Sequence, residues 1–384
     1  MKNRQIRIGM VNSTVLSSVD RIILEKDIEC ISAACDKLVV VAGNYSNHHS
    51  DNVTIIELTR FKKLREMSFG DRVWNAVRFQ LIAGRTIVNL SRRVDLMFFD
   101  IGEYRNSFLI FLTKILRCKI LLIHRGGNKY LEARYQYRKG LDRIIPHIQE
   151  AMLRFSYQLV DYLLVDSFRI IEFGNLQRYR KKILLYKSYA DSLRFKPTLK
   201  PSQREFVVGH SGRLTRKKGI LNLIAAIPEI IQTIPFVKFL IIGDGELASE
   251  IRSLIDAVSV RGYVKLNPWV SDSDLPAHLN KMRLLVLPTY EEGIPMILKE
   301  AMLCGTVVLS TPVGGIPDLV RDGETGFLLK DNNPDTIASE IIRVLGIRDL
   351  DTVAKNAREL AARLFNKDMA IKQWEETFAT ALNN

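Results

Sequence analysis

The strongest constraint on the fold of this chain is a repeated alternation between short apolar runs and longer amphipathic segments. Each apolar run has the length of a buried strand, and the segment after it is long enough for a helix, which is the pattern of βαβ units. The sequence therefore predicts two successive parallel sheets covered by helices. The runs are Val39–Ala42, Leu96–Phe99, Ile120–His124 and Leu163–Val165, then Phe206–His210, Lys238–Ile242, Leu284–Leu287 and Val307–Ser310.

The domain organisation follows from this pattern and from one interruption in it. Residues 195–204 are polar, include two prolines and fit neither helical nor strand periodicity, so we expect them to link two domains. We predict an N-terminal domain over residues 1–198, a second domain over 199–365 and a C-terminal helix over 366–384 that returns toward the first domain. Ligands of open parallel sheets bind at the carboxyl ends of the strands, so the functional loops should face the cleft between the domains.

Positive charge is concentrated in the first half of the chain. Residues 1–200 hold 35 Lys and Arg against 19 Asp and Glu, whereas residues 201–384 hold 21 against 23, within a net charge of +14. The first half should therefore face an anionic partner, for which nucleic acid and anionic lipid are both candidates. Residues 61–85 interleave cations with Trp74 and other large apolar side chains. A peripheral helix on anionic lipid has this composition, and so does a helix packed on a sheet with a solvated basic face.

Cysteine usage and hydropathy predict a cytoplasmic protein. The four cysteines show no CxxC spacing and no nearby histidine cluster, so neither a zinc site nor a disulfide framework is expected. The N-terminal sequence lacks the apolar core of a signal peptide. The most apolar stretch, Phe108–Ile123, is broken by three cations and falls short of the about 18 apolar residues of a membrane span. Any contact with the cytoplasmic face of a membrane should therefore be peripheral.

A basic, glycine-flanked loop follows the strand predicted at Phe206–His210. It reads Gly-Arg-Leu-Thr-Arg-Lys-Lys-Gly from Gly212 to Gly219. The planar guanidinium of Arg213 and the compact ammonium of Lys218 suit a diphosphate, and glycine permits close approach of the backbone. A solvated surface loop is the alternative reading, since the sequence is not a Walker A loop.

A second loop lies between Leu284–Leu287 and a predicted helix in which Pro295 fits the first position. Backbone amides at a helix start favour an anion, because they point outward and the helix dipole adds to them. The diphosphate contacts expected from the two loops are Arg213, Lys218, Gly293, Ile294, Met296 and Ile297.

Two glutamates flank this helix start, Glu292 and Glu300, with seven residues between them. A phosphate would repel both carboxylates, so their partners should be hydroxyl groups, since an ionised carboxylate can accept two donors from a vicinal diol. A ligand with a diphosphate at its centre and hydroxylated groups on either side is a nucleotide sugar. An ordinary exposed helix glutamate is the alternative for Glu300.

These loops together resemble those of the retaining glycosyltransferases of family 4, which have the two-domain GT-B fold. The resemblance is strong over residues 207–329 and rests on the basic loop, on the spacing of Glu292 and Glu300, and on the run 314–320. It implies that the first Arg and the final Lys of the basic loop hold the donor diphosphate. It also implies that Glu300 binds the ribose and that Glu292 lies beside the donor sugar as a catalytic contributor.

The resemblance implies further contacts outside these loops. A histidine after a strand of the N-terminal domain, here His124, should face the donor sugar and the acceptor as a second catalytic residue, although a lone histidine at a strand end is more often structural. The glycine loop that the family has near the N-terminus is replaced by Ser17 and Ser18. Trp269 and Val270 are expected near the nucleotide base.

The implied activity is transfer of a hexose from a UDP- or GDP-sugar to a glycan or lipid-linked acceptor, with retention at the anomeric carbon, in the synthesis of a cell-surface polysaccharide or glycolipid. Asp272 and Asp274 precede a predicted helix and should cap it, so we expect no metal and no other cofactor. A nucleotide-sugar epimerase of similar architecture is one alternative, although it is not expected to combine the paired cations with the paired glutamates. A basic nucleic-acid-binding protein is the other, but no recognised binding module accompanies the charge.

Overall fold

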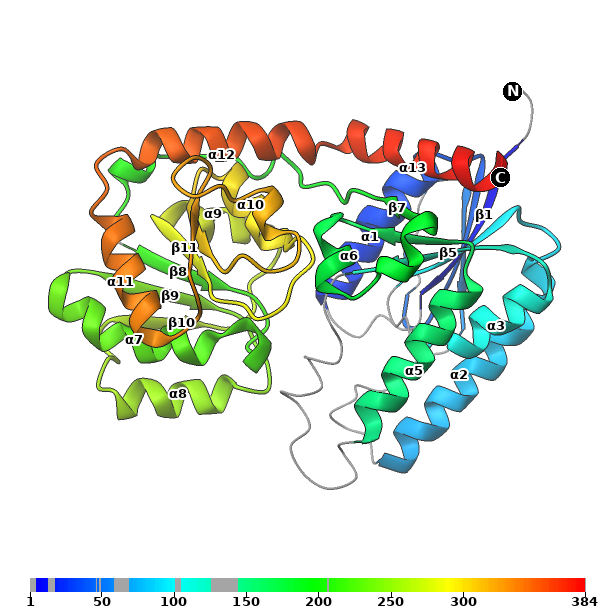
Figure 1. The fold of residues 1–384 in the computed structure, drawn as a ribbon, viewed down its shortest axis with the longest axis horizontal. Helices are drawn as coiled ribbons and strands as arrows, with labels where there is room; N and C mark the ends of the chain where they lie inside the picture. Colours follow the sequence, from blue (N-terminus) through cyan, green and yellow to red (C-terminus); the bar gives the residue numbers. More distant parts are fainter. Residues whose placement is uncertain are drawn as a thin grey trace.

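Two parallel sheets organise the chain, one in each half (Figure 1). The computed structural model describes residues 5–12, 18–45, 47, 50–58, 69–100, 105–125, 144–205 and 207–383. The N-terminal sheet has the strand order β3-β2-β1-β4-β5-β6-β7, and the C-terminal sheet has the order β10-β9-β8-β11-β12-β13. The first sheet contains β1 (Arg7–Asn12), β2 (Lys37–Ala42), β3 (Val53–Glu57), β4 (Leu96–Phe99), β5 (Lys119–His124), β6 (Tyr162–Val165) and β7 (Ile183–Leu185). The second contains β8 (Val207–Ser211), β9 (Lys238–Ile242), β10 (Val264–Asn267), β11 (Leu284–Leu287), β12 (Val307–Ser310) and β13 (Phe327–Leu328).

Both sheets reverse their winding direction next to their first strand. The chain moves outward from β1 to β3 and then returns to place β4 on the other side of β1, and β8 and β11 repeat this arrangement in the second sheet. Loops at the carboxyl ends of strands on either side of such a switch point diverge and leave a crevice for a ligand. The basic loop follows β8 and the Glu292 loop follows β11, so the two predicted donor loops flank the switch point of the second sheet.

Helices cover both faces of each sheet. In the N-terminal half they are α1 (Ser18–Ala33), α2 (Phe69–Leu90), α3 (Ser107–Ile115), α5 (Ile144–Leu159) and α6 (Arg169–Phe173). In the C-terminal half they are α7 (Ile220–Thr233), α8 (Ala248–Ala257), α9 (Leu275–Lys281), α10 (Met296–Leu303), α11 (Pro334–Leu345) and α12 (Leu350–Leu364), followed by α13 (Lys367–Asn383). None of the helices in the described part of the chain combines the length and apolarity that a membrane crossing requires.

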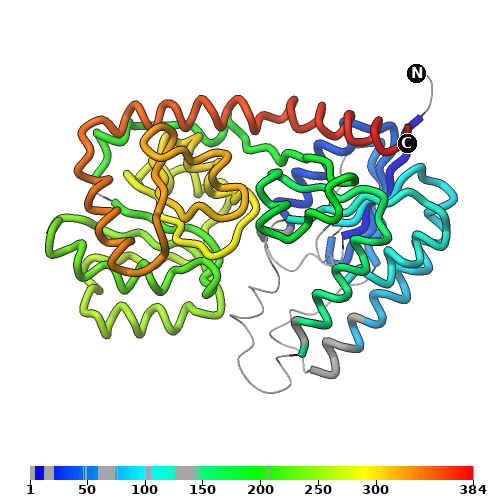
Figure 2. The backbone as a smooth tube through the Cα atoms, viewed as in Figure 1, coloured from blue at the N-terminus to red at the C-terminus, as the bar shows by residue number. Residues whose placement is uncertain are grey.

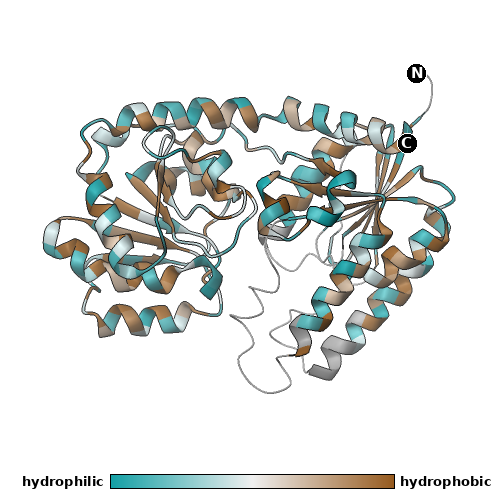
Figure 3. Cartoon of the chain, viewed as in Figure 1, coloured by the Kyte–Doolittle hydropathy of each residue, from teal (hydrophilic) through white to brown (hydrophobic). Residues whose placement is uncertain are grey.

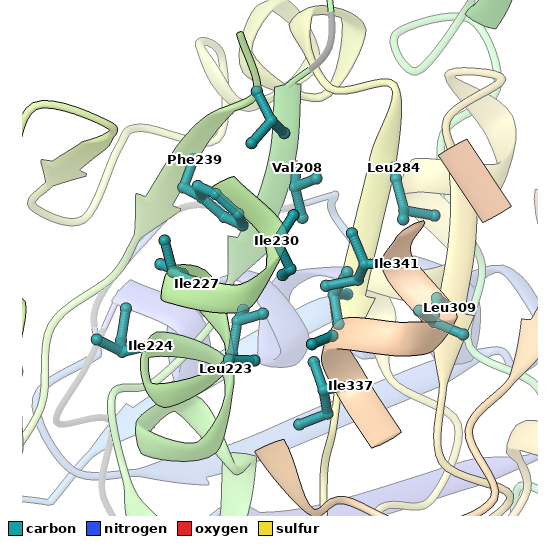
Figure 4. Packing of buried hydrophobic residues seen from close by; sticks show 14 of the residues in the cluster. Val208, Leu223, Ile224, Ile227, Ile230, Phe239, Leu284, Leu309, Ile337 and Ile341 are labelled. Carbon is teal, nitrogen blue, oxygen red and sulfur yellow. The ribbon is translucent and has the colours of Figure 1, made fainter. Parts of the chain in front are cut away.

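The strands are apolar because both of their faces are covered, which is typical of parallel sheets (Figure 3). On β8, Val208 faces α7 and α11, while its neighbour Val207 belongs to the cluster on the opposite face. Figure 4 shows the first of these clusters, in which isoleucines of α7 and α11 meet side chains of four strands. Full burial of one such side chain contributes about 1.5–3 kcal/mol, so these interfaces hold each domain together.

The last helix, α13, crosses back to the N-terminal sheet (Figure 2). Trp374 is 2% exposed and lies edge-on to Phe98 of β4, with ring centroids 5.2 Å apart. It also contacts Phe378, one turn further on, and Tyr186, just after β7. The C-terminal end of the chain is therefore part of the core of the N-terminal half.

The predicted fold class is confirmed, and the runs with the strongest apolar character match observed strands to within two residues. Strands β1, β3, β7, β10 and β13 were not predicted. β3 is an edge strand without a fully buried residue, and β13 has only two residues, so neither carries a strong apolar signal. Two local expectations differ from the structure in detail. Pro295 is the N-cap of α10 rather than its first residue. Asp274 stands at the N-cap position of α9, but its carboxylate accepts a hydrogen bond from the Ser271 hydroxyl and makes no capping hydrogen bond.

Candidate active site

The predicted donor cation and the predicted sugar-facing carboxylate lie together in the crevice of the second sheet. Lys218 ends a short 3-10 turn (Arg216–Lys218) before α7, and its ammonium forms a short ion pair with Oε1 of Glu292. The hydroxyl of Thr289 donates to the same carboxylate oxygen at 3.3 Å. The two side chains are 19% and 12% exposed, so the pair is shielded but still reachable. The β8 and β11 loops thus converge on one charged point.

Two glycines make this convergence possible. A Cβ at Gly219 (φ +66°) would lie 1.9 Å from the carbonyl oxygen of Pro288, and one at Gly314 (φ +55°) would lie 1.8 Å from the carbonyl oxygen of Glu292. Both also adopt a left-handed conformation that disfavours other residues. The loop that follows β12 is therefore packed against the Glu292 loop by backbone contact, with Gly315 N–H donating to Gly293 O at 3.0 Å.

Glu300 projects from α10 into an environment that the sequence did not reveal. It is 5% exposed, and burial raises the pKa of its carboxyl group. Its Oε1 lies 3.6 Å from Nζ of Lys26, a residue of α1 in the other domain. Lys26 in turn lies over the ring of Tyr189, 5.7 Å from its centroid. The predicted ribose contact is thus buried and faces a cation across the domain boundary, unlike an ordinary exposed glutamate.

The N-terminal domain also places a carboxylate on the predicted anion-binding amides. Asp166, directly after β6, accepts a hydrogen bond from Ile294 N–H at 2.8 Å. Gly293 permits this approach, because a Cβ there would lie 2.7 Å from Oδ2 of Asp166. Burial raises the pKa of Asp166. Met296 and Ile297 follow as the first two residues of α10. The carboxyl group of Asp166 therefore occupies one of the amides predicted to bind the diphosphate.

A buried cluster of charged side chains lies at the carboxyl ends of β4 and β5 in the N-terminal sheet. Arg125, directly after β5, bridges Asp100, which follows β4, and Asp27 of α1. The guanidinium also donates to the hydroxyl of Tyr186 at 3.2 Å. Burial raises the pKa of Asp27 to about 6, while the two carboxylates raise that of Arg125 further above its already high value. Sequence analysis missed this cluster, because its acids come from separate elements.

Lys299, next to Glu300, lies where both interdomain segments pass. Its side chain is 1% exposed, and its ammonium donates to the hydroxyl of Ser188 at 2.7 Å, in the segment after β7. The same ammonium lies 4.5 Å from the ring centroid of Phe365, between α12 and α13. Burial lowers the pKa of Lys299 to about 8. Lys299 therefore links α10 to both segments that connect the domains, the one after β7 and the one between α12 and α13.

The structure places His124 in the interior of the N-terminal domain. The residue is 2% exposed, and its Nδ1 shares a 2.6 Å hydrogen bond with the hydroxyl of Tyr157 on α5. A Cβ at Gly174, just after α6, would lie 3.4 Å from Nε2. The imidazole therefore packs between β5 and these helices, and a role toward the sugar stays a prediction.

A second histidine, His210 of β8, is fully buried and was not singled out from the sequence. Its Nδ1–H donates to the carbonyl oxygen of Val286 on β11 at 2.9 Å. Burial lowers its pKa to about 4. His210 is therefore neutral at physiological pH and links the two strands that carry the donor loops.

The remaining predicted contacts lie at the periphery of this region. Arg213 is exposed on the loop after β8, and Trp269 is 37% exposed after β10. Val270 packs against the apolar cluster that includes Leu298 of α10. Ser18 is the first residue of α1. Ser17 lies outside the described residues.

Two domains, each built on a parallel sheet covered by helices, define the GT-B architecture. The cations, the carboxylates and the start of α10 lie at the switch point of the second sheet. Solved structures show the same fold. HepE of Anabaena, in complex with UDP and glucose, matches with a TM-score of 0.74 and 18% identity over 98% of this chain and 100% of its own. Sucrose-phosphate synthase of Thermosynechococcus elongatus matches with a TM-score of 0.77 and 20% identity over 99% and 100%.

Residues 191–360 match the family described as glycosyl transferases group 1. The capsular polysaccharide biosynthesis glycosyltransferase CapM of Staphylococcus aureus is 30% identical over 182 residues, 46% of this chain and 47% of its own. The chain spans about half the length of the curated relatives that it matches. The expected resemblance to glycosyltransferases is confirmed.

Proposed function

We propose that this protein is a retaining glycosyltransferase that moves a hexose from a nucleotide diphosphate sugar to a glycan or lipid-linked acceptor. The observation that carries the proposal is the meeting of Lys218 and Glu292 at the start of α10, with Glu300 buried further along the same helix. The ammonium of Lys218 suits a diphosphate, and the carboxylates of Glu292 and Glu300 suit the hydroxyl groups on either side of that diphosphate.

The donor diphosphate would lie between the basic loop and α10. Its oxygens would take the place of the Asp166 carboxylate at the amide of Ile294 and would draw the ammonium of Lys218 away from Glu292. Glu300 would then accept hydrogen bonds from the ribose. A UDP-sugar is the first candidate, since HepE shares the fold and binds UDP and glucose, and a GDP-sugar is the second.

The reaction needs stabilisation of a departing diphosphate. The bond between the anomeric carbon and the phosphate oxygen breaks, and its electron pair leaves with the diphosphate. The acceptor hydroxyl forms the new bond on the same face of the sugar, and its proton passes to the departing phosphate oxygen. Lys218, Arg213 and the amides at the start of α10 would stabilise the charge that develops there. We propose that these groups suffice without a metal ion and that Glu292 orients a sugar hydroxyl.

The acceptor and the cellular setting extend the proposal. CapM acts in capsular polysaccharide biosynthesis, and a related role for this chain would be in a cell-surface polysaccharide or glycolipid. A lipid-linked acceptor would be reached at the cytoplasmic face of a membrane, with the protein bound peripherally through its basic N-terminal half.

A donor panel tests the function directly. The protein is heated with UDP-, GDP- and ADP-sugars in the presence of EDTA, because a ligand that binds only the native state raises the unfolding temperature. One base series should raise it, and the matching free sugar should not. Slow release of sugar from that donor, detected by NMR as the retained anomer, identifies a transferase, whereas a changed sugar still attached to its nucleotide identifies an epimerase. Stabilisation by no nucleotide sugar would refute the proposal.

A further inference from the structure

The N-terminal half exposes large apolar side chains on one group of helices. Of the sixteen that the described residues expose, ten lie on α2, α3 and α5, which have 22, 9 and 16 residues. Their exposed fractions run from 38% for Met152 to 66% for Trp74. We call the surface that they form the α2–α3–α5 face. Its members include Trp74, Leu81, Phe108, Phe111, Ile148 and Phe155.

The three helices lie next to one another on the outer side of the N-terminal sheet (Figure 1), so the face is continuous. Gly84 of α2 allows close packing against α3, since a Cβ there would already lie 3.4 Å from Leu112. The rings of Phe111 on α3 and Phe155 on α5 are both exposed and lie 6.0 Å apart between centroids. The buried sides of the same helices complete the core, so the exposed side chains are not required for packing there.

Positive charge accompanies this apolar surface. Nine Lys and Arg and three Asp and Glu lie in the three helices and the turns beside them. Two of the three acids are already in ion pairs, Asp161 with Lys114 and Glu150 with Arg154. The net charge of these segments is therefore positive. The segments counted are residues 69–93, 105–118 and 144–161.

We propose that the α2–α3–α5 face is the surface by which the protein docks onto an anionic lipid bilayer. Apolar side chains with cations around them insert at the boundary between headgroups and acyl chains, while the cations pair with lipid phosphates. A second copy of the chain fits this surface less well, because each N-terminal half carries 35 Lys and Arg against 19 Asp and Glu and would repel its partner. The inference rests on the proposed function in that a lipid-linked acceptor gives the docking its purpose.

The test is binding of the full chain to vesicles of phosphatidylglycerol mixed with phosphatidylcholine, and to vesicles of phosphatidylcholine alone. We expect at least about tenfold tighter binding to the anionic vesicles, weakened by added salt. The triple variant Leu81→Gln/Phe111→Gln/Phe155→Gln should lose at least about tenfold of that affinity. The control Leu193→Gln/Phe236→Gln removes apolar side chains that are 86% and 63% exposed elsewhere and should bind as the wild type does.

Trp74 reports on the same contact from within the face. Brominated lipids should quench its fluorescence in vesicle-bound protein, and the variant Trp74→Phe should lose most of the quenching, because Trp374 is buried and Trp269 lies in the other domain. Equal binding to both kinds of vesicle, or wild-type binding by the triple variant, would overturn the proposal. The proposal would also be overturned if the wild type formed a dimer and bound no lipid, and if the triple variant were a monomer. Vesicle binding needs no donor, so its outcome is independent of the donor panel.

Discussion

Removal of the Lys218 ammonium should weaken binding of a nucleoside diphosphate much more than binding of the nucleoside. In the structure this ammonium lies at the end of the Arg216–Lys218 turn and pairs with Glu292 in a shielded position, 19% exposed. A charge-assisted hydrogen bond in such a site contributes about 1.5–3 kcal/mol. The dissociation constant for UDP, or GDP if the panel selects that base, should therefore rise about 10- to 150-fold in Lys218→Ala.

The same loop supplies a matched control. Arg216 also carries a positive charge, but its guanidinium pairs with Glu250 at the surface, where the side chains are 42% and 46% exposed. Such exposed pairs contribute about 0–1 kcal/mol, and the partner of Arg216 lies on α8 rather than in the Glu292 loop. Arg216→Ala should therefore change the dissociation constant for the diphosphate less than about threefold.

Isothermal titration with the nucleoside, its monophosphate and its diphosphate measures the effect. The loss in Lys218→Ala should be largest for the diphosphate and absent for the nucleoside. The variant Glu292→Gln adds an independent check, because it frees the ammonium from its carboxylate and should leave diphosphate affinity equal or higher while lowering turnover. Equal losses in Lys218→Ala and Arg216→Ala, or an equal loss for nucleoside and diphosphate, would show that Lys218 does not hold the phosphates.

Three further predictions concern the packing of loops, strands and helices. Gly314→Ala should lower the free energy of unfolding by about 2–4 kcal/mol, because the added methyl group would collide with the backbone of the Glu292 loop. Gly323 also has a positive φ, but no atom lies within 4 Å of its Cβ position, so Gly323→Ala should lower the free energy of unfolding by only about 1 kcal/mol. Urea unfolding measures both changes. Burial lowers the pKa of His210 from 6.5 to about 4, so between these pH values the unfolded chain binds a proton that the native protein does not. The free energy of unfolding should therefore fall by about 3 kcal/mol as the pH drops from above 6.5 to below 4. Urea unfolding at several pH values should show a smaller pH dependence for His210→Asn than for the wild type. Trp374→Ala should cost about 3–5 kcal/mol and lower the melting temperature, and an unchanged melting temperature would show that α13 is not part of the N-terminal core.

Much of the fold could be predicted from local sequence. Strands buried on both faces, such as β11 and β12, read as uninterrupted apolar runs, and their bounds were predicted without error. The edge strand β3 could not be predicted, because its half-exposed residues follow no clear pattern. The helix start at α10 was predicted to within one residue from Pro295, whose fixed φ suits a helix boundary.

The candidate site divides in the same way. The basic loop and the spacing of Glu292 and Glu300 are local patterns, so they could be found in the sequence. Lys26 and Asp166 could not, because each is a single charged residue on an ordinary helix or strand end. Their meaning arises only where the N-terminal domain brings them to Glu300 and to the amide of Ile294.

The sequence by itself determined the alternation of strands and helices, the two parallel sheets and the residue types offered to a diphosphate and to hydroxyl groups. These properties depend on short-range periodicity and on the chemistry of neighbouring residues. Only the tertiary structure decided which charges meet: Lys218 with Glu292, Lys26 with Glu300, and Arg125 with two buried acids. It also decided that apolar side chains of three helices share one exposed face. The physical reason is that charge pairing and exposure depend on distances between segments far apart in the chain, which the packing of both sheets sets.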